Sequence, residues 1–408
     1  MTQTGHEAAV ESGFNNFDYS VAGDVRDPYP ELAEVRRATP VLDVGDIGDV
    51  MPGSGGLFVA FSFDAVSKVL RDNEVFSSAI LGEVMGEVMG HKLILAMDEP
   101  EHRRHRSLVS TAFRQSELAR WEESLVARVV NDLIDQFVDR GRAELVHDYT
   151  FPFPTKVVAG VLGLPTEDYR RFQAWAVGII TANADMDRGR QASSELKDYL
   201  ADILAARRAA PRDDLISDLA HASLDDESLD DEEIFSFLRL LLPAGVETTF
   251  RSSGNLLYLL LTHPEQLDAV RKDRSLIPQA IEEALRLEPP LLITSRVATR
   301  DTELAGVAIP AGSMVTPMLG AANRDETHYS DPDAFNIFRD PKQHISFGTG
   351  PHMCLGMHLA RMETRIAVNA LFDRLPNLRL DPVAFERDDA HIHGQIFRSP
   401  TSIPVIWD

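Results

Sequence analysis

The only cysteine of the chain, Cys354, stands in the run Phe347-Gly348-Thr349-Gly350-Pro351-His352-Met353-Cys354-Leu355-Gly356. One cysteine cannot form an intramolecular disulfide or a four-cysteine metal site, so it is an inert thiol, a nucleophile or a lone thiolate ligand. The glycines permit backbone angles that a β-carbon would block. Apolar spacing predicts a helix over Leu355–Leu375, and a thiolate at a helix N-terminus is favoured by the helix dipole. A glycine loop leading to such a thiolate suits an iron porphyrin approached from one side.

Two other interpretations of this segment stay open on spacing alone. His352, Cys354 and His358 fit on a turn and one helical face, an arrangement that could bind zinc. The other alternative is that Cys354 is a buried free thiol beside a glycine turn, which is the commonest role of a single cysteine.

A second segment that could do chemistry is Ala244-Gly245-Val246-Glu247-Thr248-Thr249. Ala244 and Gly245 are small enough to leave room beside a helix. Thr248 lies four residues after Ala244, so its hydroxyl can bond to that carbonyl and loosen the helical ladder. Glu247 supplies a carboxylate that can relay protons.

The segment lies in the middle of a long predicted helix. Asp230 and Glu233 match a capping box at its start. The apolar pattern continues to Leu261, which makes a helix of roughly 48 Å at about 1.5 Å per residue. Pro243 removes one backbone donor and is expected to kink the helix just before the reactive segment.

Basic residues gather between Glu99 and Phe113 in an otherwise acidic chain. His102 and Arg106 are four residues apart and therefore share one face of a helix. By spacing alone, this segment is interpreted as a helix face exposed to solvent.

The Cys354 loop resembles the haem-binding loop of the haem-thiolate monooxygenases, the cytochrome P-450 family. Phe347, Gly348, Gly350, His352, Cys354 and Gly356 stand at the signature positions. The resemblance implies haem b (iron protoporphyrin IX) with the Cys354 thiolate as axial ligand. It also implies an oxygen-binding segment at Ala244 and Gly245, proton delivery by Glu247 and Thr248, and propionate binding by His102, Arg106, Arg296 and His352.

The family resemblance extends to the fold, which is expected to be mainly α with a minor β lobe in a single large domain. It spans residues 25–408, after a flexible N-terminal tail over residues 1–24. In the family, a buried ion-pair trio supports the fold, and the matching residues here are Glu283, Arg286 and Arg339. Leu291–Arg296 is expected to form a strand.

Composition sets limits on location and partners. The formal net charge of −24 disfavours binding to nucleic acid or to an anionic membrane surface. No apolar run approaches the roughly 20 residues of a membrane span, and no signal pattern is present near Met1. A single thiol agrees with a reducing compartment. We expect a cytoplasmic protein without a membrane anchor.

The family activity implied is insertion of one atom of dioxygen into a lipophilic small molecule, that is, hydroxylation. The electrons would come from a ferredoxin-type donor and its NAD(P)H reductase, because the chain contains no reductase segment. Arg103, Arg104, Arg361 and Arg365 are expected to form a basic surface for an acidic donor. The alternative for some of them, favoured for Arg361, is an internal ion pair. The alternatives are a peroxide-driven haem peroxygenase and a non-catalytic haem-binding protein.

The substrate class is expected to be terpenoid, steroid, fatty acid or macrolide, because the predicted pocket residues are apolar. The repeated Gly-Glu-Val-Met run at residues 82–89 is expected to be a mobile loop over the pocket. The predicted pocket residues are Met85, Met89, Val246, Leu291, Leu292, Ile293, Ile396 and Phe397.

Overall fold

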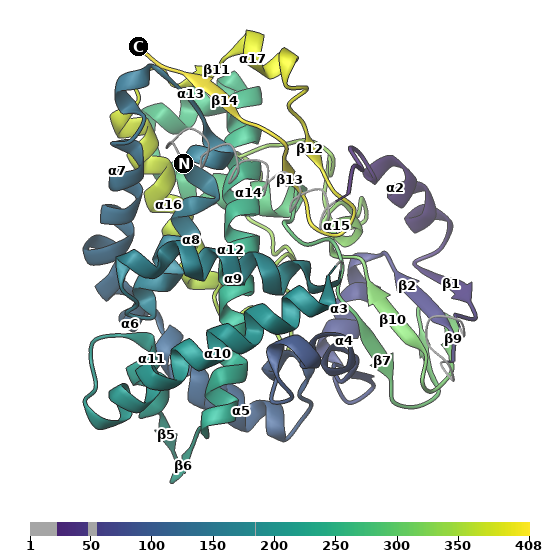
Figure 1. Cartoon of the computed structure of the whole chain (residues 1–408). Coiled ribbons are helices and arrows are strands. Elements are labelled where there is room, and N and C mark those ends of the chain that lie inside the picture. The colour runs from purple at the N-terminus through teal and green to yellow at the C-terminus, as the bar shows by residue number, and fades with distance from the viewer. Residues whose placement is uncertain (1–22, 48–54, 184) are drawn as a thin grey trace.

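The helices and strands separate into a large helical part and a smaller part rich in strands (Figure 1). This computed structural model describes residues 23–47, 55–183 and 185–408. The predicted tail over residues 1–24 lies almost entirely outside the described residues. Within the described part of the chain, no helix has the length and apolar character needed to cross a membrane. The prediction of a mainly α fold with a minor β lobe is confirmed.

The α-helices are α2 (Tyr29–Ala38), α3 (Phe63–Arg71), α4 (Ile80–Met89), α5 (Glu101–Ser110), α6 (Gln115–Trp121), α7 (Arg128–Ile134), α8 (Pro152–Val161), α9 (Tyr169–Ile180), α10 (Met186–Ala209), α11 (Leu215–Ala220), α12 (Asp231–Thr262), α13 (Pro264–Lys272), α14 (Ile277–Leu287), α15 (Leu319–Ala322), α16 (Met357–Arg374) and α17 (Pro382–Arg387). The strands are β1 (Val41–Gly45), β2 (Leu57–Ala60), β3 (Phe76–Ser77), β4 (Arg142–Glu144), β5 (Ser223–Leu224), β6 (Glu227–Ser228), β7 (Arg296–Ala298), β8 (Thr302–Leu304), β9 (Val307–Ile309), β10 (Met314–Pro317), β11 (Arg379–Leu380), β12 (Ile392–His393), β13 (Ser399–Pro400) and β14 (Pro404–Ile406).

The main sheet has the strand order β1-β2-β10-β7-β3. β10 runs parallel to β2 and antiparallel to β7, so Val315 lies between Phe58 and Arg296. Helix α3 buries Val66 and Val69 in the core of this lobe. This register places Arg296 at the start of β7, where the sheet meets the helical part.

Helix α12 is the central element of the helical part (Figure 1) and packs against α8, α9, α10, α14 and α16. The predicted capping box is confirmed, because Asp230 accepts from the Glu233 amide and Glu233 accepts from the Asp230 amide. The helix ends before His263, as the sequence predicts. It continues through Pro243 without a break, and the kink at that residue stays a prediction.

The segment predicted as a mobile loop is instead a helix, α4, between residues 80 and 89. Its glycines serve close packing: a β-carbon on Gly82 would lie 3.2 Å from the Ala96 β-carbon. Ile80, Val88 and Met89 are buried, and this apolar side holds the helix in place despite the poor helix propensity of glycine.

The strand predicted over Leu291–Arg296 is also wrong in its extent, because β7 begins only at Arg296. Leu291 bridges to Phe397 and Ile293 bridges to Met318. These two partners belong to different segments, so no continuous ladder forms before β7.

The acid of the predicted trio, Glu283, is buried on α14 between two arginines. Arg286 Nε lies 2.8 Å from Glu283 Oε2, and Arg339 Nε lies 3.2 Å from Glu283 Oε1. The remaining guanidinium donors reach backbone carbonyls, among them those of Asn323 and Ala334. These buried ion pairs connect α14 to the segment around residue 336. Removing one partner would leave the remaining charges buried without a counter-charge.

We expect Glu283→Gln to lower the free energy of unfolding by about 3–5 kcal/mol, the range for breaking a buried ion pair. Thermal and urea unfolding of the haem-loaded protein would measure the loss. The matched control is Arg26→Gln, which removes a solvent-exposed pair with Asp389 and should leave the unfolding midpoint unchanged. Equal effects of the two substitutions would contradict the structural role of the trio.

Candidate active site

A cavity of about 340 Å³ lies between α12 on one side and the Cys354 loop with the start of α16 on the other. Helix α5 and the start of β7 close its end. Most of its wall is apolar. The predicted cofactor-binding residues all line this cavity: His102, Arg106, Ala244, Gly245, Arg296, Phe347, Gly348, His352, Cys354 and Gly356.

The Cys354 loop is a tight turn that glycines make possible. Gly348 and Gly350 have φ values of 69° and 76°, in the left-handed region. A β-carbon on Gly350 would lie 2.6 Å from the Leu70 carbonyl oxygen, so the loop packs closely on α3. The Cys354 amide donates to the Phe347 carbonyl over 2.8 Å. The turn therefore presents the Cys354 side chain to the cavity.

Cys354 lies just before α16, because that helix begins only at Met357. The prediction that Cys354 sits at the N-terminus of this helix is therefore wrong, because the helix begins three residues after it. Burial raises the pKa of the Cys354 thiol, while the Gly356 amide and the Arg106 guanidinium oppose that rise. The sequence argument from the helix dipole did not anticipate this shift, and coordination to a metal ion would deprotonate a thiol that faces the cavity in this way.

Four groups that can carry positive charge face the cavity from three separate segments. The rings of His102 and His352 lie 4.0 Å apart between centroids. Arg106 donates to the Met353 carbonyl over 2.6 Å. Arg296 comes from the start of β7 and is buried.

Within the described part of the chain, only His102 of these four groups has a carboxylate within ion-pair distance, because its Nδ1 lies 3.5 Å from Glu99 Oε1. Arg106 and Arg296 form no ion pair there, and the Nε2 atoms of His102 and His352 are buried without a hydrogen-bond partner. Burial lowers the pKa of Arg296 to about 10. Burial, together with the neighbouring cations, lowers the pKa of His352 to about 3.

This arrangement fits haem. Its two propionates would supply carboxylates to buried donors that otherwise have none, each through a charge-assisted hydrogen bond. Cys354 would supply the axial thiolate from the loop side. The zinc alternative loses support, because among the described residues no group of three His, Cys, Asp or Glu side chains is placed to hold a metal ion.

Thr248 faces the cavity from α12, and its hydroxyl donates to the Ala244 carbonyl over 2.7 Å, as predicted. Gly245 also lines the cavity. A β-carbon there would lie 2.9 Å from Val158, so this glycine allows α8 to pack close to α12 in addition to leaving room in the cavity.

Glu247 does not line the cavity, although it is adjacent to Thr248 in sequence. Neighbouring residues of a helix point about 100° apart. Glu247 is buried in an ion pair with Arg251, whose Nε lies 2.6 Å from Glu247 Oε1. Arg251 in turn donates to Ser399 Oγ over 2.6 Å. The spacing of four residues between Glu247 and Arg251 was the sequence signal for this pair.

Of the predicted substrate-pocket residues, the structure brings only Leu291 to the cavity wall. Ile396 is 40% exposed, and its carbonyl accepts from the Leu292 amide, so this hairpin backs the wall and does not enter it. The others lie outside this wall: Met85, Met89, Val246, Leu292, Ile293, Ile396 and Phe397. The apolar residues that do line it include Ile94, Leu95, Phe113, Phe237, Leu240 and Leu241.

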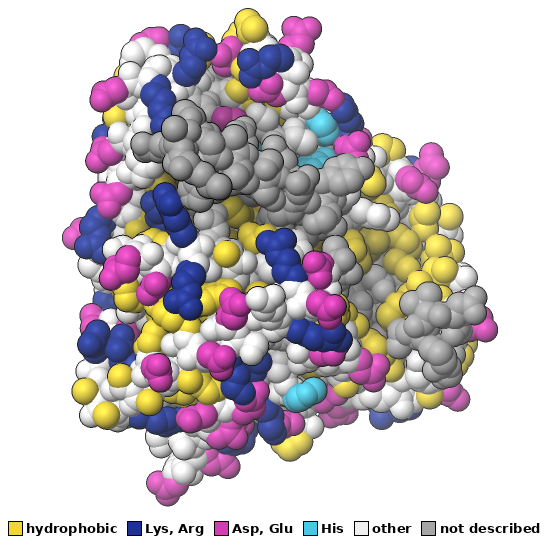
Figure 2. All heavy atoms as spheres, viewed as in Figure 1, with side chains coloured by type: hydrophobic (Ala, Val, Ile, Leu, Met, Phe, Trp, Pro, Cys, Tyr) yellow, Lys and Arg dark blue, Asp and Glu magenta, His cyan; other side chains and the backbone are white. Residues whose placement is uncertain are grey.

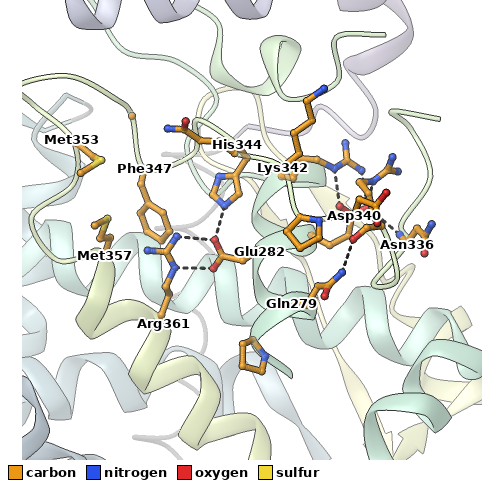
Figure 3. A pocket seen from close by; sticks show the side chains of 17 residues that line it. Gln279, Glu282, Asn336, Asp340, Lys342, His344, Phe347, Met353, Met357 and Arg361 are labelled. Carbon is orange, nitrogen blue, oxygen red and sulfur yellow. Dashed lines mark hydrogen bonds and ion pairs between the residues drawn. The ribbon is translucent and has the colours of Figure 1, made fainter. Parts of the chain in front are cut away.

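A second, more open pocket lies on the other side of the Cys354 loop (Figure 3). Phe347, Met353 and Met357 form its apolar side, and Glu282 lies between Arg361 and His344. Burial opposes ionisation of Glu282, but hydrogen bonds from Arg361 and His344 lower its pKa to about 2.

We expect Cys354→Ala to abolish the red-shifted absorption band of the reduced, carbon monoxide-bound protein, because that band depends on thiolate ligation. The substitution leaves the buried cations and their carboxylate partners in place, so some haem should remain bound. Spectra of both proteins at matched haem content would measure the effect. A variant that keeps the band would remove Cys354 from the metal.

Comparison with known proteins agrees with this geometry. The family model described as "Cytochrome P450" matches residues 170–382. The solved structure of P450BioI in complex with hexadec-9Z-enoic acid ligated acyl carrier protein is 32% identical, with a TM-score of 0.84, and the match covers 94% of this chain and 98% of that one. The structure of CYP109E1 from Bacillus megaterium in complex with corticosterone is 30% identical, with a TM-score of 0.83, covering 93% and 98%.

The cytochrome P450 monooxygenase PikC of Streptomyces venezuelae is 35% identical over 390 residues, which cover 93% of this chain and 91% of PikC. These matches extend over more than nine tenths of the chain. Proteins of this family bind haem through a cysteine thiolate, and Cys354 is the only cysteine available for that ligation. The chain belongs to the cytochrome P450 family of haem-thiolate monooxygenases.

Proposed function

We propose that this protein hydroxylates a lipophilic small molecule held in the cavity between α12 and the Cys354 loop. The observation that carries the proposal is the composition of that cavity. One wall presents a thiol, the opposite wall presents a threonine hydroxyl, and apart from the four cationic groups most of the remaining surface is hydrocarbon. Haem bound through Cys354 supplies the oxygen chemistry, which thiolate ligation favours.

The chain's own residues position the substrate and manage protons. The apolar wall excludes bulk water and places a C–H bond near the α12 side of the cavity. Thr248 Oγ1, now bonded to the Ala244 carbonyl, can turn to hold a water or donate a proton in the cavity. Glu247 is the nearest carboxylate in sequence, and we propose that it exchanges protons with that hydroxyl after release from Arg251.

We infer the substrate class from the apolar lining of the cavity and from the ligands of two similar proteins. Two similar proteins have been solved with corticosterone and with a fatty acid carried on a protein. We propose a lipophilic ligand of comparable size for this cavity. Steroids, fatty acids, terpenoids and macrolides can be screened by the change in the haem spectrum that follows displacement of water from the iron.

We propose that the electrons come from a ferredoxin-type protein and its reductase. The sequence predicted that Arg103, Arg104, Arg361 and Arg365 receive this donor. In the structure each of them is paired with an acidic residue: Glu99 for Arg103, Glu227 and Glu233 for Arg104, Glu282 for Arg361 and Glu122 for Arg365.

These pairs leave little free positive charge at the predicted positions. On the face shown in Figure 2, basic and acidic side chains are likewise interspersed. Lys342 differs, because it is exposed at the open pocket of Figure 3 and makes no ion pair within the described residues. We propose that a donor docks at this pocket, near Met353 and Phe347, with Lys342 as a steering charge.

With a ligand from the spectral screen, we expect Thr248→Ala to keep its haem while more of the consumed reducing equivalents end as hydrogen peroxide. Product formed per electron consumed would measure this coupling. Thr262→Ala is the matched control, because Thr262 makes the same hydroxyl-to-carbonyl bond on α12 outside the cavity. Glu247→Gln should mainly slow turnover, since an amide cannot exchange the proton. Unchanged coupling in Thr248→Ala would contradict the proposed role.

We expect Lys342→Glu to slow reduction by an acidic ferredoxin severalfold at low salt and little at high salt, because charge steering fades over a Debye length of about 8–10 Å. Stopped-flow reduction rates at several salt concentrations would test this. Arg103→Glu makes the same charge change at a residue already paired with Glu99. If Arg103→Glu slows reduction as much as Lys342→Glu does, the donor docks elsewhere.

A further inference from the structure

One wall of the active-site cavity is held from behind by residues that are distant in sequence. Pro290 and Leu291, shortly after the end of α14, line the cavity. The Arg398 amide donates to the Pro290 carbonyl over 3.1 Å, and the Leu292 amide donates to the Ile396 carbonyl over 2.8 Å. The backbone of this wall is therefore paired with the hairpin formed by β12 and β13, and the position of the wall depends on the position of the hairpin.

The Arg398 side chain fastens the hairpin to two other segments. It is 1% exposed, and its Nε lies 2.8 Å from Glu288 Oε2, just beyond α14. Its Nη1 and Nη2 atoms donate to the carbonyls of Val25 and Arg26 over 3.0 and 2.8 Å. Nη1 also donates to the Gly394 carbonyl within the hairpin over 2.7 Å. A planar guanidinium that makes all these bonds fixes the orientation of the hairpin.

Glu288 is the centre of this buried cluster. Its Oε2 atom also accepts from the Tyr29 hydroxyl over 2.9 Å, and its Oε1 atom accepts from Arg324 Nη2 over 3.0 Å. The Arg324 guanidinium carbon lies 3.4 Å from the centroid of the Tyr29 ring, a cation–π contact. From α12, the Asn255 side-chain amide donates to the backbone carbonyls of Glu288 and Arg398. The N-terminal segment, α14, α12 and the hairpin thus meet at one carboxylate.

The hydroxyl of Tyr29 is a permanent donor in this cluster. Burial and the Glu288 carboxylate raise the pKa of Tyr29, so the hydroxyl keeps its proton. One carboxylate serves two guanidinium groups and this hydroxyl in the protein interior, where each bond affects the others. Tyr29, Glu288 and Arg398 are not among the described residues that line the cavity. They can act on it only through the wall at Pro290 and Leu291.

We propose that Tyr29, Glu288 and Arg398 are positioning residues, which set the shape of the cavity at Leu291 and thereby select the ligands that it accepts. The N-terminal segment before α2 takes part in this selection through the carbonyls that bind Arg398. The inference rests on the proposed function where it concerns the choice of substrate. Ligand binding tests it whether or not a product forms.

The test uses the haem-loaded protein and the variant Tyr29→Phe, which removes the hydroxyl bond to Glu288 and keeps the ring against Arg324. The probes are imidazole and 4-phenylimidazole, which bind haem iron through a ring nitrogen and are followed by the haem spectrum. Imidazole is too small to fill the cavity, whereas the phenyl group extends into it. A misplacement of about 1 Å can cost about 10²-fold in an active site, and the loss of one hydroxyl should move the wall less. We expect the dissociation constant of 4-phenylimidazole to shift by about threefold to tenfold and that of imidazole to stay the same.

Two further variants separate positioning from a general loss of stability. Tyr149→Phe is the matched control, because Tyr149 is also buried and its hydroxyl makes one bond of 2.9 Å, to the Ala367 carbonyl away from the cavity. It should leave both dissociation constants unchanged. In a Leu291→Ala background, Tyr29→Phe should have little further effect on 4-phenylimidazole, because the side chain through which it acts is absent.

The proposal is overturned if Tyr29→Phe leaves 4-phenylimidazole binding unchanged, if it shifts imidazole binding equally, or if Tyr149→Phe has the same effect. Additive effects of Tyr29→Phe and Leu291→Ala would also overturn it, because Tyr29 would then act elsewhere. Haem content and the carbon monoxide band are measured on every variant, and loss of haem in Tyr29→Phe would make Tyr29 structural and overturn the proposal. A protein that shows the expected binding shifts but forms no hydroxylated product would contradict the proposed function and leave this inference standing.

Discussion

One sulfur atom has to face α12 across a gap wide enough for a flat cofactor, and the surrounding structure depends on this placement. The loop can present Cys354 only because Gly350 packs directly against the backbone of α3 and Gly348 turns through the left-handed region. The opposite wall requires a continuous run of helix, which the capping box at Asp230 begins and which packs against neighbouring helices. The width of the cavity is thus the distance between two rigid elements.

The active-site cavity is lined by positively charged groups, although the chain as a whole is strongly acidic. A protein of net charge −24 concentrates His102, Arg106, Arg296 and His352 around one buried cavity. Burying cations is costly, and the lowered pKa values of Arg296 and His352 reflect that cost. Binding of a cofactor with two carboxylates would remove this cost, because each carboxylate provides a counter-charge. Haem binding and stability of this region are therefore coupled through the same groups.

Helix α12 carries two sets of polar residues with different environments. Thr248, Thr249 and Ser252 face the cavity, where a ligand or water can reach them. Glu247 and Arg251 face protein, where they bind each other. In the proton delivery that we propose, a proton that enters through Glu247 has to cross from one side of the helix to the other, and the carboxylate has first to leave its ion pair with Arg251.

The sequence alone determined those features that depend on a few neighbouring residues. The Cys354 loop, the ends of α12, the bond from Thr248 to Ala244 and the shared face of His102 and Arg106 all follow from backbone geometry within one turn or one helix. These features, and the family resemblance they carry, were sufficient to predict the fold class and the cofactor.

Only the tertiary structure decided which side chains meet across the cavity. Ile396 backs the wall, the glycine-rich segment before residue 90 is a helix, and Glu247 turns to Arg251, because packing between segments distant in sequence sets each outcome. Glu363 shows the same limit most clearly. Its position on α16 is readable from the sequence, but its burial in the cavity wall, where Oε2 has no hydrogen-bond partner among the described residues, results from how two helices pack. Helical spacing assigns a residue to a face of its own helix, whereas the neighbour of that face is a property of the whole chain.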